Sequence, residues 1–202
     1  MKRSPTPLSK IIYSVTHDYC TNKYTLEDRS TQNSYQRVAE NKERILGMVP
    51  WDDQRKQQPE INWTDYHQQG GDYAEHHSNR PRYEPAFMEL VKPYLGLFLQ
   101  ESEYKFCDVT RCWLQRYAKN NFHAPHDHGP RGYACVFYAE LDPEVHGSTE
   151  FLQPSPSLDG GKGMQSIQVV EGDLVLFPCN LFHQSPPHFS DKYRTVIAFN
   201  LY

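Results

Sequence analysis

The fold class is decided at residues 133–141, which read YACVFYAEL and are nearly continuous in apolar side chains. A short apolar run of this kind is typical of a β-strand that is buried in a core. Similar or loosely alternating runs occupy residues 104–118, 173–177 and 194–202. Turns that contain Pro and Gly separate the runs, and this arrangement predicts a β-sandwich or a β-barrel.

The last of these strands has two different faces, because successive side chains of a strand point to opposite sides of the sheet. The face that begins at Thr195 is bulky and apolar and is suited to packing. The other face carries Arg194 and then only small or polar side chains, so it is suited to lining a cavity. An arginine in a cavity favours a two-pronged contact with a ligand carboxylate. The alternative is an ordinary ion pair with an acidic side chain at the surface.

The N-terminal part differs in composition from the rest of the 202-residue chain. Leu, Ile, Val and Phe number 10 in residues 1–80 and 32 in residues 81–202. A segment so poor in these residues is a weak candidate for an independent core. Tyr and Trp are frequent there, and their rings can dock while their polar tips stay hydrated. We therefore predict a tyrosine-rich extension at residues 1–82, packed on a core domain at residues 83–202.

Two helices are predicted before the strands. Residues 34–48 have approximately helical spacing of apolar side chains, whereas residues 50–82 are typical of a loop. A second helix is expected after Pro85, because residues 87–98 follow the i, i+3, i+4 pattern of an apolar stripe. Pro93 should kink this helix, and the stripe should pack on a sheet.

Composition and charge exclude several classes of protein. Hydrophobic residues make up 38% of the chain and charged residues 23%, and no apolar run approaches the ~20 residues of a membrane span. A net charge of −4 argues against a general affinity for nucleic acids or anionic membranes. The five cysteines include no CxxC pair, so we expect reduced thiols rather than disulfides or a zinc cluster. The basic start precedes no apolar stretch, so we expect a cytoplasmic protein.

Histidines carry the candidate chemistry, and residues 123–129 read HAPHDHG. On a strand, His126 and His128 would project from the same side, with Asp127 pointing away. Two imidazoles on one strand are a common beginning of a transition-metal site, although histidine-rich turns also occur without a metal. His183 follows the 173–177 strand by a short turn and could complete a three-residue face.

An ordered set of motifs from about residue 113 to the end resembles the Fe(II)/2-oxoglutarate-dependent dioxygenases, in particular their prolyl-4-hydroxylase-like branch. The matching residues, in chain order, are Tyr117 nine positions before His126, Pro125, the segment GSTEF at 147–151, Gly172 and Asp173 before His183, and Arg194. The resemblance covers under half of the chain. It implies a double-stranded β-helix, which is a mainly β, jelly-roll, cupin-like fold, with helices before it.

The resemblance also implies a set of ligands. His126, His128 and His183 would hold Fe(II), while Arg194 and Tyr117 would bind the far carboxylate of 2-oxoglutarate, with O2 as the second cosubstrate. Many relatives carry a small hydroxyl residue two positions after the arginine, where this chain has Val196. Thr195 is therefore a further candidate for that contact.

One departure from the family pattern concerns the metal itself. The family uses His-x-Asp or His-x-Glu, and this chain has His126-Asp127-His128. Three explanations stay open: iron bound by three histidines, ligation by Asp127 through a bulged backbone, or a site that has lost its activity.

The implied activity is hydroxylation of an unactivated C–H bond, with a prolyl or other peptidyl residue as the first substrate guess. One alternative is a cupin-type three-histidine dioxygenase that uses no 2-oxoglutarate. Another is a noncatalytic β-barrel binding module. Of the remaining histidines, we expect His123 in a solvated loop, with a position beside the metal ligands or the substrate as the alternative. We expect His146 in a turn, His188 at the surface, and the adjacent pair His76 and His77 exposed.

Overall fold

The structure is a computed structural model of the chain. It describes residues 10–15, 21–26, 41–57, 60–66, 80–101, 108–152 and 164–202. The expected exposure of His76 and His77 concerns residues outside these ranges. Of the described helices, none is long and apolar enough to cross a membrane.

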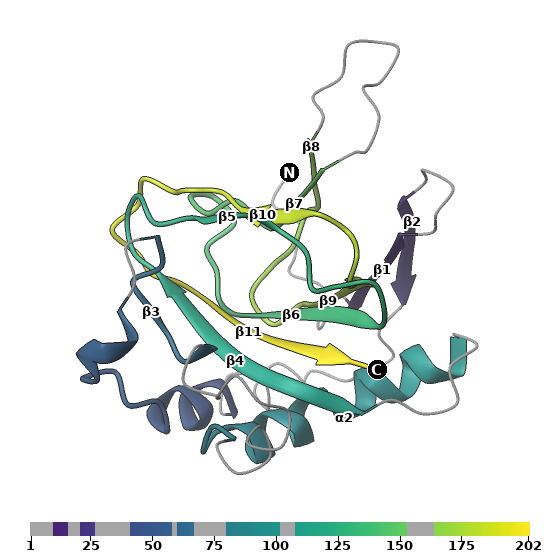
Figure 1. The fold of residues 1–202 in the computed structure, drawn as a ribbon, viewed down its shortest axis with the longest axis horizontal. Helices are drawn as coiled ribbons and strands as arrows, with labels where there is room; N and C mark the ends of the chain where they lie inside the picture. Colours follow the sequence, from purple (N-terminus) through teal and green to yellow (C-terminus); the bar gives the residue numbers. More distant parts are fainter. Residues whose placement is uncertain are drawn as a thin grey trace.

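Two antiparallel sheets form the body of the protein (Figure 1). The five-stranded sheet has the order β3 (Trp63–Thr64), β4 (Val109–Tyr117), β11 (Arg194–Leu201), β6 (Tyr133–Glu140) and β9 (Leu174–Pro178). The four-stranded sheet has the order β5 (His123–His126), β10 (His183–Ser185), β7 (Glu150–Leu152) and β8 (Met164–Ser166). The four sequence runs correspond to β4, β6, β9 and β11, and the fold is the predicted mainly β jelly roll. A separate hairpin of β1 (Lys10–Val15) and β2 (Thr21–Leu26) places β1 alongside β9.

The two faces of β11 divide the protein into two apolar clusters. Ile197 and Phe199 belong to the outer cluster, between the five-stranded sheet and the helix α2 (Glu84–Glu101). Val196 and Ala198 belong to the inner cluster, which lies between the sheets and also contains Phe151 of β7. The alternation that the sequence indicated is therefore confirmed, and the Arg194 side of the strand faces the interior of the jelly roll.

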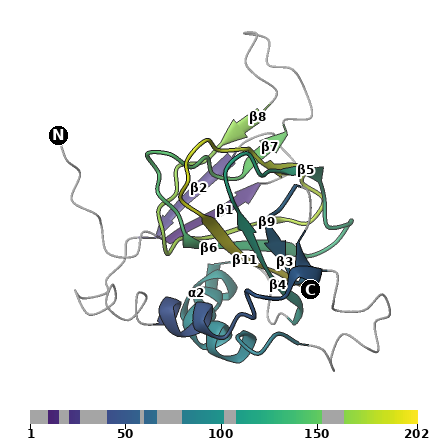
Figure 2. The same cartoon turned by 90° about the vertical axis from the view of Figure 1, so that its left-hand side faces the viewer.

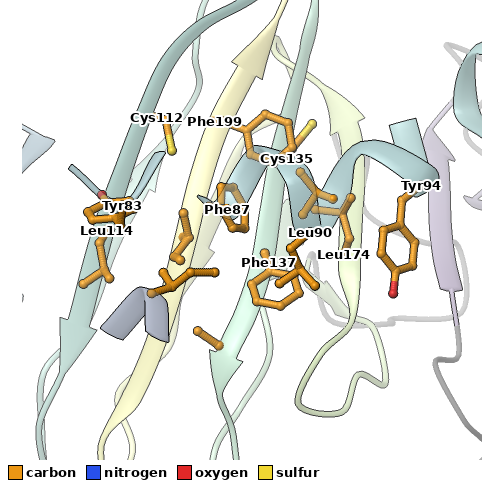
Figure 3. Packing of buried hydrophobic residues seen from close by; sticks show 14 of the residues in the cluster. Tyr83, Phe87, Leu90, Tyr94, Cys112, Leu114, Cys135, Phe137, Leu174 and Phe199 are labelled. Atoms are coloured by element: carbon orange, nitrogen blue, oxygen red, sulfur yellow. The ribbon is translucent and has the colours of Figure 1, made fainter. Parts of the chain in front are cut away.

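Helix α2 covers the outer face of the five-stranded sheet, as Figure 3 shows. Phe87 is fully buried, and its ring centroid lies 5.5 Å from that of Phe137 and 5.7 Å from that of Phe199. The helix begins at Glu84, one residue before Pro85, because proline is tolerated in the first turn, where its missing N–H has no partner in any case. Pro93 lies inside α2 and does not end it.

Part of the N-terminal extension contributes to the core, and Figure 2 shows its helix beside α2. Residues 41–47 are helical, within the predicted helix, and Ile45 is buried in the outer cluster. The prediction of a loop at 50–82 is wrong at two places, since a 3-10 helix forms at Gln54–Lys56 and Trp63–Thr64 pairs with β4 as an edge strand. Trp63 is 2% exposed, so an aromatic ring provides the burial that the aliphatic count did not indicate.

Asp65 links the segment of residues 60–66 to the core through hydrogen bonds. Its carboxylate accepts hydrogen bonds of 2.8 Å from the Tyr83 hydroxyl and from the backbone N–H of Leu114. Burial raises the pKa of Asp65, while the two donors satisfy its oxygens. The division of the chain at residue 82 stays a prediction.

The thiols agree with the expectation as far as the structure describes them. Cys112, Cys135 and Cys179 are buried thiols. Cys20 and Cys107 lie outside the described residues.

Candidate metal centre

Three histidines converge between the ends of two neighbouring strands. His126 ends β5 and pairs in register with His183, which begins β10. His128 lies two residues beyond β5, where its backbone N–H donates to the Cys179 carbonyl at 2.8 Å. One ligand atom from each ring lies within 4.8 Å of the others, and the Nε2 atoms of His128 and His183 are 3.3 Å apart. This arrangement is suited to a single metal ion on a face of three imidazoles.

The backbone orients two of the rings. Nδ1 of His126 lies 2.8 Å from the Ala124 carbonyl oxygen, and Nδ1 of His183 lies 2.8 Å from the Leu181 carbonyl oxygen. A carbonyl oxygen only accepts, so each Nδ1 carries the proton and each Nε2 keeps its lone pair for a metal. Hydrogen bonds of this kind fix the tautomer and the direction of metal-binding histidines.

Burial keeps the three rings neutral. It lowers the pKa of His183 to about 3 and that of His128 to about 4, and it also lowers the pKa of His126. The neighbouring imidazoles add to the effect at His183 and His128, because a second positive charge would lie beside the first. Neutral imidazole is the form that binds metal ions, so the site is ready for a metal at neutral pH.

Asp127 does not lie in this group. Its Oδ1 accepts from the backbone N–H of Gly129 at 3.0 Å, in a turn where Gly129 has a φ of 101°. A side chain bonded to its own turn points away from the ring cluster, as strand alternation predicts. The structure therefore gives no support to the alternative in which Asp127 replaces His128 as a ligand.

Arg194 is a buried cation at the start of β11, with 1% of its surface exposed. Its Nη1 donates to the Gly147 carbonyl at 2.6 Å and its Nη2 donates to the Ser185 hydroxyl. Its Nε is buried and has no hydrogen-bond partner. Among the ion pairs of the described residues, none involves Arg194. The surface ion pair considered from the sequence is therefore not found.

Tyr117 lies beside Arg194 in the adjacent strand, and the two residues pair in register. The guanidinium carbon of Arg194 lies 4.4 Å from the centroid of the Tyr117 ring. Burial raises the pKa of Tyr117 to about 12, so its hydroxyl stays protonated and donates to Gln115 Oε1 at 2.9 Å.

Thr195 lies on the opposite side of β11 from Arg194. Its hydroxyl contacts Arg116 Nε at 3.0 Å and the Glu140 carboxylate. The structure therefore does not bring Thr195 to the Arg194 site. It gives no support to the prediction that Thr195 contacts the cosubstrate.

Gln115 connects the Arg194 and Tyr117 side of the site with the histidine group, and the sequence did not indicate this connection. Gln115 accepts from Tyr117, and its Nε2 lies 3.3 Å from Nδ1 of His123. The His123 ring is in turn 4.1 Å from the His126 ring, between centroids. His123 thus lies on β5 against a candidate ligand rather than in a solvated loop. The alternation of β4 places Gln115 and Tyr117 on one face, which is the signal that could have found Gln115.

Two further histidines are buried near Arg194. His146 follows a turn, as expected, and its Nδ1 accepts from the backbone N–H of Asp142 at 3.0 Å. His188 is 2% exposed, so its predicted position at the surface is wrong. Its Nε2 lies 3.4 Å from the Tyr117 carbonyl, and its ring centroid is 4.5 Å from that of His146. The loop before β11 folds back over the end of β4, a contact that local sequence does not encode.

Residues 111–200 match the model of a protein family described as "Putative 2OG-Fe(II) oxygenase". The resemblance predicted from the motifs is thereby confirmed, and the matched segment contains the three histidines, Tyr117 and Arg194. No curated protein matches the chain.

Solved structures are similar to this chain at low sequence identity. The viral collagen prolyl hydroxylase vCPH from Paramecium Bursaria Chlorella virus-1, in its 2OG complex, is 10% identical with a TM-score of 0.54, over 81% of this chain and 89% of that one. A 2OG-Fe(II) oxygenase family oxidoreductase from Burkholderia pseudomallei is 16% identical with a TM-score of 0.46; the match covers 60% of this chain and spans 58% of that one. HygX from Streptomyces hygroscopicus, with nickel and 2-oxoglutarate bound, is 16% identical with a TM-score of 0.46, over 58% and 66% of the two chains. The likeness to vCPH supports the jelly-roll fold.

Proposed function

We propose that this chain is an Fe(II)- and 2-oxoglutarate-dependent oxygenase that hydroxylates an unactivated C–H bond. One observation carries the proposal: the buried guanidinium of Arg194 has no acidic partner among the described residues, and it lies in the same jelly roll as three convergent neutral imidazoles. Glu150 acts on Arg194 electrostatically without an ion pair, and a buried cation with no carboxylate in contact is costly, so a ligand carboxylate is the expected complement.

The residues fit both groups. His126, His128 and His183 would hold Fe(II), leaving other positions for a cosubstrate and O2, which is the arrangement of facial iron sites. Arg194 would bind the far carboxylate of 2-oxoglutarate, and its unpartnered Nε supplies a donor for it. The protonated Tyr117 hydroxyl would be a second donor there once its proton turned from Gln115 Oε1 to the carboxylate. When bound, iron and 2-oxoglutarate supply the oxidising power, while the protein positions the substrate and excludes water.

The substrate class rests on the resemblance to the prolyl-4-hydroxylase-like branch, which was read from Tyr117, His126, His183 and Arg194. A prolyl or other peptidyl residue is therefore the first class to test. The alternative of a cupin-type three-histidine dioxygenase is favoured by one observation, the absence of a carboxylate from the ligand group of the described residues. Arg194 argues against it, because an enzyme that needs no 2-oxoglutarate has no use for a buried carboxylate receptor.

The test is anaerobic reconstitution with Fe(II), followed by titration with 2-oxoglutarate while the weak visible charge-transfer band is recorded. We expect the band in the wild type and its loss in Arg194→Ala and in His128→Ala. Arg131→Ala is the matched control, because it removes an exposed arginine from the same domain and should leave the band unchanged. A wild type that binds iron but gives no band would refute the dependence on 2-oxoglutarate and favour the cupin-type or noncatalytic alternative.

A further inference from the structure

The interior face of β4 runs along the candidate site from the cosubstrate end to the metal end. Tyr117 pairs in register with Arg194 at the cosubstrate end. Trp113 lies on the same face, about 13 Å earlier along the strand, and belongs to the same inner cluster. Its ring centroid is 5.5 Å from that of the candidate ligand His128. Because 2-oxoglutarate would occupy the stretch between Arg194 and the metal, the Trp113 end is left for the substrate.

Two buried polar groups on the interior faces of β4 and β11 have no hydrogen-bond partner among the described residues. They are the indole N–H of Trp113, which is a donor, and the Oδ1 of Asn200, which is an acceptor. Trp113 is 3% exposed and Asn200 is 8% exposed. A buried polar group without a partner costs free energy, and native proteins keep few of them. An unpaired donor and an unpaired acceptor on one side of the sheet fit a ligand that supplies both partners.

The two groups occupy neighbouring positions of that face. Ala198 pairs with Trp113 across the two strands, so Asn200 is the diagonal neighbour of Trp113, at a distance of about 7 Å. The side chains next to Asn200 are small, with Ala198 on its own strand and Ala134 opposite it on β6. Large apolar side chains therefore do not fill the space beside Asn200 from these two positions. Arg194 begins the same face of β11 and lies at its other end.

We propose that Trp113 and Asn200 form a subsite for a secondary amide of the substrate, which is the group of a peptide bond. The proposal rests on the proposed function and deepens it by naming the chemical group that is recognised beside the metal. The indole N–H would donate to the amide carbonyl, and Asn200 Oδ1 would accept from the amide N–H. An amide carries its acceptor and its donor on separate atoms, as two side chains on neighbouring strands require. Both side chains are neutral, so neither would compensate a charged group.

The probe is N-methylacetamide, a single peptide group capped by two methyl groups. It is titrated into protein that is loaded with Zn(II), which supports no turnover, and saturated with 2-oxoglutarate. The readout is the indole N–H resonance of Trp113 in the proton–nitrogen NMR spectrum, assigned by its loss in Trp113→Phe. We expect a saturable shift to lower field, because a hydrogen bond to a carbonyl deshields the proton. N,N-dimethylacetamide keeps the carbonyl but has no N–H, so it should bind at least about fivefold more weakly.

Asn200→Leu removes the acceptor and keeps the branched shape of the side chain. It should weaken the binding of N-methylacetamide at least about fivefold and change that of N,N-dimethylacetamide less than about twofold. Without a probe, the variant should unfold at the same or a higher urea concentration than wild type, because an unpartnered buried oxygen is removed. Asn180→Leu makes the same substitution at an exposed position. This matched control should leave both affinities unchanged.

Three results would overturn the proposal. The first is the lack of a saturable shift of the Trp113 resonance below about 1 M N-methylacetamide, since weaker binding has no favourable standard free energy. The second is equal affinity of the wild type for the two amides, a comparison that needs no variant. The third is a lower urea midpoint of Asn200→Leu with unchanged affinity for N-methylacetamide, which would make Asn200 a structural residue.

Acetate is a further probe, because Arg111 pairs in register with Asn200 and brings a positive charge to this end of the face. Tighter binding of acetate than of N-methylacetamide, read from the same resonance, would overturn the amide and assign the subsite to a carboxylate. Failure of 2-oxoglutarate to bind is recorded before any probe is added and would refute the proposed function instead. The amide titration of the zinc-loaded protein then decides the subsite by itself.

Discussion

Acid should destabilise the metal-free protein through the same rings that would bind the metal. In the unfolded chain a histidine has a pKa near 6.5, whereas burial lowers the pKa of His183 to about 3 in the folded protein. The unfolded state therefore binds more protons between these two values. The stability contributed by the neutral ring is fully present above about pH 6.5 and is lost progressively as the pH falls toward 3.

The magnitude follows from the two pKa values. Between pH 7.5 and pH 5.0, His183 alone should cost about 2 kcal/mol of unfolding free energy. His128, with its pKa lowered to about 4, should cost about the same. Because the two Nε2 atoms lie 3.3 Å apart, the rings interact and their contributions will not simply add.

The assay is urea unfolding of the metal-free protein at both pH values. In His183→Gln the loss of stability between pH 7.5 and 5.0 should shrink by about 2 kcal/mol relative to wild type. Phe182→Leu is the matched control, because it changes the exposed neighbour of His183 and adds or removes no titrating group. An identical pH dependence in wild type and His183→Gln would refute the reasoning and would mean that His183 is not held neutral by burial.

Three further outcomes are expected. Asp65→Ala should lower the unfolding free energy, measured in urea, by about 2–5 kcal/mol, because it leaves the buried Tyr83 hydroxyl and Leu114 N–H without an acceptor. A loss below about 1 kcal/mol would mean that these two hydrogen bonds do not stabilise the fold. Arg194→Lys keeps the positive charge but loses the planar, two-pronged guanidinium. Calorimetric titration of the cobalt-loaded variant should therefore show 2-oxoglutarate binding weakened about 10- to 100-fold. Unchanged affinity would mean that the far carboxylate of 2-oxoglutarate binds elsewhere. Thr195→Val should leave 2-oxoglutarate affinity within about twofold while costing about 1 kcal/mol of stability, since its hydroxyl bonds on the outer face; a large loss of affinity in the same titration would restore it to the site.

Local sequence patterns were sufficient to predict the main strands and the helix that covers them. The alternation of residues 194–201 separated the packing face from the interior face, because strand geometry turns every second side chain the same way. The apolar stripe of residues 87–98 likewise predicted a helix that packs on that sheet. The order of Tyr117, His126, His183 and Arg194 resembles that of a known oxygenase family, and this resemblance, rather than the spacing alone, implied the metal and cosubstrate groups.

Sequence patterns were enough to predict the strands β4, β6, β9 and β11, the interior face of β11 and the candidate histidines, because these depend on periods of two and on short spacings. The folded structure was needed to show that Thr195 lies outside and that His123 and His188 are packed against the site. It also showed that the buried Nε of Arg194 has no hydrogen-bond partner among the described residues. Each of these outcomes depends on contacts between segments far apart in the chain, and the burial that lowers the pKa of His183 exists only once those segments have come together.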